Sequence, residues 1–209
     1  MRYLYLHGFA SGPQSGKAGF FRAKMAELGL SLEIPDLSEG DFEHLTISGQ
    51  LAVVERELKG EAAFLFGSSM GGYLAALYAT SHPEVHKLVL LAPAFQFAYR
   101  WPEKLGPEVT AEWQRTGFRE VFHHTLGRME KVWWELVADG IRHPAEPAFP
   151  QPALIFHGVH DDVVPVSFSE EYAAKHSNAS LHILPSDHQL NDQLEQIWEV
   201  TRMFLPNQR

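Results

Sequence analysis

The stretch that decides the fold is Ala63-Phe64-Leu65-Phe66-Gly67-Ser68-Ser69-Met70-Gly71-Gly72, which joins an apolar run to an apolar-periodic segment. The run predicts a buried strand over 62–66, and the following segment predicts a helix over 70–81. Gly67 and Gly71 stand two positions either side of Ser69, which gives the G-x-S-x-G pattern of a sharp strand-to-helix turn. Side chains at these two positions would collide in such a turn, so both must be glycine.

The same turn selects a candidate nucleophile. Ser69 fits better than Ser68, whose corresponding neighbours, Phe66 and Met70, are bulky. The backbone N–H of Met70 lies at the start of the predicted helix, where the helix dipole favours developing negative charge. A second donor is expected from the N–H of Phe9, because the loop after the first predicted strand lies beside the turn. These two amides are therefore predicted to form an oxyanion hole.

A serine hydroxyl is a weak nucleophile unless a base takes its proton, so a carboxylate and an imidazole should follow in the order Ser, Asp, His. The run His157-Gly158-Val159-His160-Asp161-Asp162-Val163-Val164-Pro165 follows the fifth predicted strand, and His188 follows the sixth. Ligands bind at the carboxyl ends of strands in open parallel sheets, and both groups lie there. His188 is the predicted base and Asp161 the predicted orienting acid, with Asp162 as the alternative.

The rest of the chain predicts an α/β fold. Short apolar runs alternate with amphipathic segments, which is typical of repeated βα units with right-handed crossovers. The predicted strands lie at 3–7, 32–35, 62–66, 87–91, 153–157 and 181–184, and the predicted helices at 17–28, 45–58, 70–81, 167–176 and 191–204. We expect one domain over 1–209, with a mostly parallel six-stranded sheet between helices on both faces.

The interval after the fourth predicted strand is too long for a single crossover helix. Several prolines break it into short helical fragments, so we predict a helical cap or lid insertion over 94–149. This segment holds 10 of the 25 Phe, Trp and Tyr residues in 56 of 209 positions. The aromatic side chains either form the core of a small subdomain or line a substrate pocket.

Two motifs resemble known hydrolases. The pattern H-G-x-x-D-x-x-V-P at 157–165 resembles the acid loop of many α/β-hydrolase esterases, in which the acid stands four residues after the His, here Asp161. The opening His7-Gly8-Phe9-Ala10-Ser11-Gly12-Pro13, with Ser15 and Lys17, resembles the small bacterial YqiA-like esterases. The resemblance implies a minimal three-layer α/β-hydrolase fold and a serine esterase that cleaves small to medium carboxylic esters or thioesters through an acyl-enzyme.

Composition and hydropathy argue against several kinds of partner, location and chemistry. The net charge of −9 disfavours nucleic acid as a partner. No apolar stretch approaches the ~18 residues of a membrane helix, and the start does not resemble a signal peptide, so we expect a cytoplasmic protein. The absence of cysteine excludes a thiol nucleophile and disulfides. No oligomeric state is favoured.

Other interpretations remain open. The same fold and residues could serve an acyltransferase, a C–C hydrolase or a lyase, or a ligand-binding homologue without turnover. The side chains of 157–162 could also be mistaken for metal ligands, but the acid loop explains them, so we expect neither metal nor cofactor. His7 and His157 are expected to stabilise loops by hydrogen bonding rather than to act in catalysis.

Overall fold

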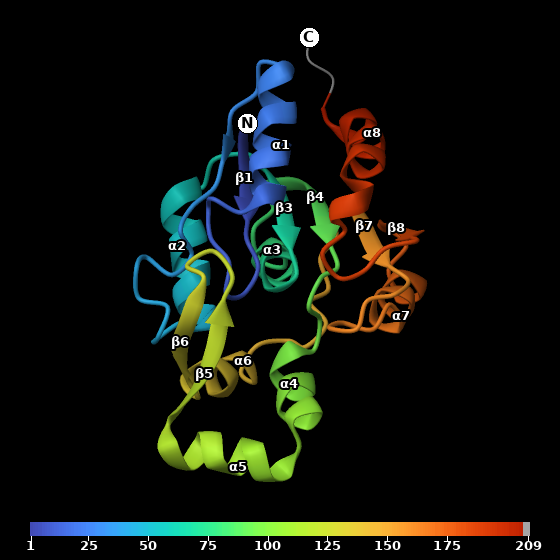
Figure 1. The fold of residues 1–209 in the computed structure, drawn as a ribbon. Helices are drawn as coiled ribbons and strands as arrows, with labels where there is room; N and C mark the ends of the chain where they lie inside the picture. Colours follow the sequence, from blue (N-terminus) through green and yellow to red (C-terminus); the bar gives the residue numbers. More distant parts are fainter. Residues whose placement is uncertain (207–209) are drawn as a thin grey trace.

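The computed structural model describes residues 1–206, which contain a six-stranded sheet in the order β2-β1-β3-β4-β7-β8 (Figure 1). All five neighbouring pairs run parallel. The strands are β1 (Arg2–Leu6), β2 (Leu32–Glu33), β3 (Ala63–Ser68), β4 (Val85–Leu91), β7 (Ala153–Gly158) and β8 (Ala179–Leu184). Their carboxyl ends therefore meet at one edge, where the sequence motifs were expected to gather.

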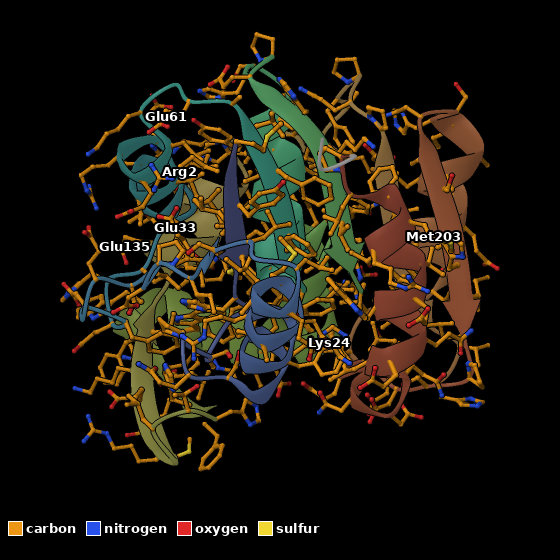
Figure 2. The ribbon with its side chains drawn as sticks, turned by 90° about the horizontal axis from the view of Figure 1, so that it is seen from above. Arg2, Lys24, Glu33, Glu61, Glu135 and Met203 are labelled. Atoms are coloured by element: carbon orange, nitrogen blue, oxygen red, sulfur yellow. The ribbon has the colours of Figure 1, made fainter. Side chains whose placement is uncertain are left out.

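Helices cover both faces of the sheet. The helices are α1 (Gly16–Glu27) and α8 (Leu194–Phe204) on one face, and α2 (Ile47–Leu58), α3 (Met70–Ala79) and α7 (Ser167–Lys175) on the other. Figure 2 shows α1, which carries Lys24, and α8, which carries Met203, on the same side. Alternating side chains of β3 divide the core, since Phe64 and Phe66 pack toward α1 and Leu65 toward α3. The predicted three-layer α/β architecture is confirmed.

The six predicted strands and five predicted helices are all present, with boundaries that differ by a few residues. The last predicted helix begins as a short 3-10 turn, Asn191–Gln193, before α8. Such differences are expected, because caps and frayed ends are set by local hydrogen bonds more than by apolar spacing.

The insertion between β4 and β7 is only partly helical. It contains α4 (Phe97–Leu105), α5 (Pro107–Thr116) and α6 (Glu135–Gly140), but also an antiparallel hairpin of β5 (Phe118–His123) and β6 (Arg128–Trp133). Gly127 provides the positive φ, 66°, that the hairpin turn requires. The side chains of β5 alternate between two faces, and this period of two is a strand pattern that the expectation of helical fragments overlooked.

The hairpin packs over the carboxyl edge of the sheet, beyond the strand ends in Figure 1. The His124 N–H donates to the Ala10 carbonyl oxygen at 2.9 Å, and the Trp133 N–H donates to the Glu43 oxygen at 3.0 Å. The His123 ring also lies edge-on to Phe42, with centroids 4.8 Å apart. The insertion is thereby fastened to the loops that follow β1 and β2.

The aromatic side chains of the insertion divide between the two roles considered from sequence. Trp113 is fully buried, donates through Nε1 to the Val132 oxygen and packs edge-on against Trp101 and Trp134. These rings form a small core within the insertion. Trp101 also contacts Phe9 at a centroid distance of 5.0 Å, so one edge of this core reaches the loop after β1.

Candidate active site

The turn between β3 and α3 is strained at Ser69. Its φ of 54° and ψ of −115° lie in a region that residues with a side chain rarely adopt. A Cβ on Gly67 would stand 2.3 Å from the Gly71 oxygen, and a Cβ on Gly71 would stand 2.0 Å from the Leu6 oxygen. Both glycines are therefore required by close backbone approach, as the sequence pattern predicts.

Ser69, His188 and Asp161 form a continuous chain of hydrogen bonds. The Ser69 Oγ lies 3.0 Å from His188 Nε2, and His188 Nδ1 lies 2.6 Å from Asp161 Oδ2. A proton on Nδ1 satisfies the carboxylate and leaves Nε2 free to accept the serine proton. Asp162 is exposed and does not contact His188, so the structure brings together the first of the two acid candidates.

Asp161 is held as an acceptor. Its Oδ1 accepts hydrogen bonds from the backbone N–H groups of Val163, at 2.9 Å, and Val164, at 2.7 Å. Burial opposes ionisation of Asp161, but hydrogen bonds from His157 and His188 outweigh it and hold the pKa of this carboxyl well below its usual range. The group therefore carries a negative charge beside His188 at neutral pH.

The two histidines expected to stabilise loops do so. His157 is fully buried, and its Nδ1 lies 2.7 Å from Ser169 Oγ while its Nε2 lies 2.8 Å from the Val164 oxygen. The ring therefore ties both ends of the acid loop to α7. His7 Nε2 accepts from the Leu37 N–H at 3.2 Å, and burial lowers the pKa of His7, which favours this neutral acceptor.

The two predicted oxyanion donors lie on either side of Ser69. Met70 is the first residue of α3, and Phe9 follows Gly8 in the loop after β1, whose end pairs Leu6 with Gly67. A Cβ built on Gly8 would stand 3.4 Å from the Ser69 Cβ, so this loop lies beside the serine with room for little more than a glycine. Among the hydrogen bonds of residues 1–206, none uses the N–H of Met70 or Phe9 as donor. Both amides remain available to a ligand.

Two cationic side chains of α4 hold the acid loop from the insertion side. Arg100 Nη2 donates to the Val163 oxygen at 2.8 Å, and Lys104 Nζ donates to the Asp162 oxygen at 2.6 Å. These contacts link the insertion to the loop that carries Asp161. Sequence reasoning missed them, because a charged pair spaced by four residues on an exposed helix gives no sign of its distant partners.

Lys17 is a second feature that the sequence reasoning left without a role. It is 8% exposed, and its Nζ donates to the Ser68 Oγ at 3.1 Å, beneath the strained turn. Burial lowers the pKa of Lys17 to about 8, although the carboxylates of Asp187 and Asp161 act in the opposite direction. A buried ammonium therefore stands next to the turn that presents Ser69.

Lys17 predicts a pH-dependent stability. Its pKa is about 8 in the folded protein and 10.5 ordinarily. Between these values the unfolded chain holds a proton that the folded chain lacks, so the free energy of unfolding rises with pH, by about 3 kcal/mol in total. Urea unfolding from pH 7 to 10.5 should show this rise in the difference between the wild type and Lys17→Met, because the titration of other groups, such as the buried tyrosines, is common to both proteins. A constant difference between the two proteins across that range would contradict the assignment.

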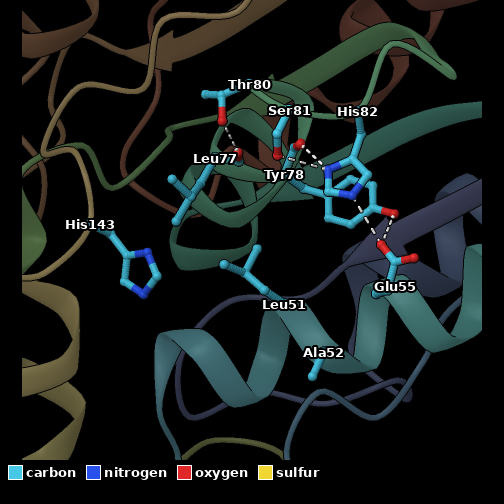
Figure 3. A pocket seen from close by; sticks show the side chains of 9 residues that line it. All are labelled: Leu51, Ala52, Glu55, Leu77, Tyr78, Thr80, Ser81, His82 and His143. Atoms are coloured by element: carbon cyan, nitrogen blue, oxygen red, sulfur yellow. Dashed lines mark hydrogen bonds and ion pairs between the residues drawn. The ribbon is translucent and has the colours of Figure 1, made fainter.

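A cavity of about 390 Å³ lies elsewhere, between α2 and the carboxyl end of α3 (Figure 3). Its wall includes Glu55, paired with His82 Nε2 at 3.0 Å, and His143 on the opposite side. None of the predicted site residues lines it. Within residues 1–206 no helix is long and apolar enough to cross a membrane, and no three His, Asp or Glu side chains are placed to hold a metal ion.

Solved structures of α/β hydrolases superpose on nearly the whole chain. The mouse alpha/beta hydrolase domain-containing protein 10 is 18% identical with a TM-score of 0.78, over 97% of this chain and 88% of its own. Est1E from Butyrivibrio proteoclasticus, solved with ferulic acid, is 23% identical with a TM-score of 0.80, over 96% and 86%. A monoacylglycerol lipase from Paleococcus ferrophilus is 16% identical with a TM-score of 0.76, over 97% and 92%. The chain therefore has the α/β-hydrolase fold.

Within this fold, the chain belongs to the uncharacterised protein family UPF0227, whose profile matches residues 2–205. The membership confirms the resemblance to YqiA-like proteins that the opening motif indicates. A search of curated proteins finds no sequence that matches this chain.

Proposed function

We propose that the protein is a serine hydrolase that cleaves carboxylic ester or thioester bonds of small to medium acyl substrates. The observation that carries the proposal is the hydrogen-bonded chain from Ser69 Oγ through His188 to Asp161, built on a strained turn at the carboxyl edge of the sheet. A nucleophile, a base within hydrogen-bond reach and a group that orients the base are the parts that acyl transfer requires.

The proposed reaction has two halves. Ser69 Oγ attacks the substrate carbonyl carbon while His188 Nε2 takes the serine proton, and the N–H groups of Met70 and Phe9 donate to the resulting oxyanion. The tetrahedral intermediate collapses as His188 returns the proton to the departing alcohol or thiol, which leaves an acyl-Ser69 ester. Water then attacks this ester, giving a proton to His188, and the bond from the acyl carbon to Ser69 Oγ breaks as His188 returns that proton to the oxygen, which releases the acid product and regenerates Ser69. Asp161 stabilises the imidazolium that forms in both halves.

Hydrolysis is favoured over the other reactions of the fold by the comparisons, since one similar structure is described as a monoacylglycerol lipase. We also propose that the insertion at 94–149 acts as a cap within a single domain. Its α4 donates hydrogen bonds to the acid loop, and its Trp101 packs against Phe9, so it contacts both the loop that carries Asp161 and the loop that carries a proposed oxyanion donor.

The test uses purified protein with p-nitrophenyl acetate and butyrate, together with a fluorophosphonate probe. We expect turnover of both esters, loss of turnover on labelling, and one probe per chain on the peptide that contains Ser69. A label on another residue would show that Ser69 is not the nucleophile. Preferential transfer of the acyl group to an added alcohol or thiol over water would show that the protein is an acyltransferase rather than a hydrolase.

A further inference from the structure

One face of β5 points toward the loop that carries Phe9. The side chains of Arg119, Val121 and His123 alternate with the more exposed Glu120 and Phe122. Val121 packs against the main core, and His123 packs on Phe42, which in turn packs on Phe9. Arg119 belongs to the same inward face, where apolar and aromatic groups surround it.

Within residues 1–206 the guanidinium of Arg119 has neither a hydrogen bond nor an ion pair. It lies over the rings of Trp101 and Trp113, 5.7 and 5.4 Å from their centroids. Its Nη1 is buried without a hydrogen bond, and in residues 1–206 no carboxylate lies within ion-pair distance of it. Neighbouring arginines of the insertion differ, since Arg115 pairs with Glu112 and Arg128 with Glu130.

An unpaired guanidinium in such surroundings is costly. Burial lowers the pKa of Arg119, and no anion acts against that effect. Aromatic faces stabilise the cation partly, but they supply no acceptors for its five N–H donors. Buried N–H donors in proteins are normally paired, and the unpaired Nη1 of the half-buried Arg119 therefore offers a donor that an anionic group could satisfy.

Contacts connect Arg119 to the candidate nucleophile. The Trp101 ring, beneath the guanidinium, has its centroid 5.0 Å from that of Phe9, and Phe9 follows Gly8, where an added Cβ would meet the Ser69 Cβ. The other cations on this side, Arg100 and Lys104, already donate to carbonyl groups of the acid loop. The side chain of Arg119 instead has no hydrogen bond or ion pair within residues 1–206, and it lies over the Trp101 ring that packs on Phe9.

We propose that Arg119 determines specificity by binding a carboxylate of the substrate, so that the preferred esters carry an anionic group remote from the bond that is cleaved. This inference rests on the proposed function, since it names the substrate class of the same site. The planar guanidinium can donate two parallel hydrogen bonds to a carboxylate, and the Trp101 ring offers an apolar wall beside it.

The first test compares matched esters that differ only in one charge. One pair places the carboxylate in the acyl part, as p-nitrophenyl hydrogen adipate and its methyl ester. The other pair places it in the leaving group, as 4-carboxyphenyl acetate and its methyl ester. The wild type should favour the anionic member of at least one pair by about tenfold or more in kcat/KM.

Variants assign that preference to Arg119. Arg119→Met keeps the length of the side chain but removes the charge, and it should lower kcat/KM for the favoured anionic ester about 10- to 100-fold while changing its neutral partner less than about threefold. Arg119→Lys should fall between the two, because an ammonium lacks the planar fork. Arg128→Met on the same hairpin is the matched control and should preserve the preference. Equal losses on both esters, or no preference in the wild type, would overturn the proposal.

Binding without turnover separates this proposal from the proposed function. Calorimetry should show that Ser69→Ala binds p-nitrophenyl hydrogen adipate more tightly than its methyl ester. Adding Arg119→Met to this variant should remove the difference in affinity. If no ester is hydrolysed but this difference in affinity is present, the proposed hydrolase activity is wrong and the proposed carboxylate site at Arg119 is supported. If neutral esters are hydrolysed at Ser69 but both ligands bind Ser69→Ala equally, the proposed carboxylate site at Arg119 is wrong and the proposed hydrolase activity is supported.

Discussion

Replacing Ser69 with alanine should lower kcat for p-nitrophenyl butyrate by about 10⁴- to 10⁶-fold and abolish fluorophosphonate labelling. Removing the nucleophile of such a triad leaves only the acceleration supplied by the oxyanion donors and by binding. The serine side chain makes one hydrogen bond within the site, to His188 Nε2, so its loss should cost little stability. Steady-state kinetics, labelling and thermal unfolding of the same preparations check the three parts of this prediction.

Ser68→Ala is the matched control for this experiment. Ser68 is adjacent in sequence, but its hydroxyl accepts a hydrogen bond from the buried Lys17 on the other side of the turn. The variant should keep its label and retain kcat within about tenfold, while it loses stability because the Lys17 ammonium is left without that acceptor. If Ser68→Ala were inactive and Ser69→Ala active, the chosen nucleophile would be wrong.

The strained turn was predictable because its cause is local. The collision that requires glycine at 67 involves backbone atoms of Gly71 and Gly72 in the turn itself, whereas the one at 71 involves the backbone of Leu6 and His7 at the end of the neighbouring strand. The positions of Asp161 and His188 followed from topology, because a parallel sheet brings the residues after its strands to one edge. Three short motifs in the right order therefore sufficed to place the candidate triad.

The insertion was less predictable because its structure depends on partners remote in sequence. The hairpin is held by Ala10 and Glu43, and α4 is held by carbonyl groups of the acid loop. Arg119 resembles any strand arginine in the sequence, and only the structure shows that two indole rings lie beside it and that no carboxylate of residues 1–206 pairs with it. The burial of Lys17 likewise depends on how α1 packs against the end of β3.

The electrostatic arrangement around His188 predicts a second large effect. Asp161→Asn should lower kcat by about 10⁴-fold while the fold is retained. Asp161 accepts from the N–H groups of Val163 and Val164 through Oδ1 and from His188 and His157 through Oδ2. An amide can keep its oxygen toward the two backbone donors only if its NH₂ group faces His188. The imidazole must then accept at Nδ1 and carry its proton on Nε2, where it can no longer take the proton of Ser69.

Asp162→Asn provides the comparison that isolates this effect. The two aspartates are adjacent and have the same chemistry, but the Asp162 side chain is exposed, and its backbone oxygen rather than its carboxylate accepts from Lys104. Its amide variant should keep kcat within about twofold, so the ratio of the two variants measures the orientation of His188 rather than the loss of one negative charge near the site. A larger loss in Asp162→Asn than in Asp161→Asn would show that the acid loop rearranges when substrate binds and that the other carboxylate orients the base. Equal, small losses would show that His188 keeps its tautomer without help from either carboxylate.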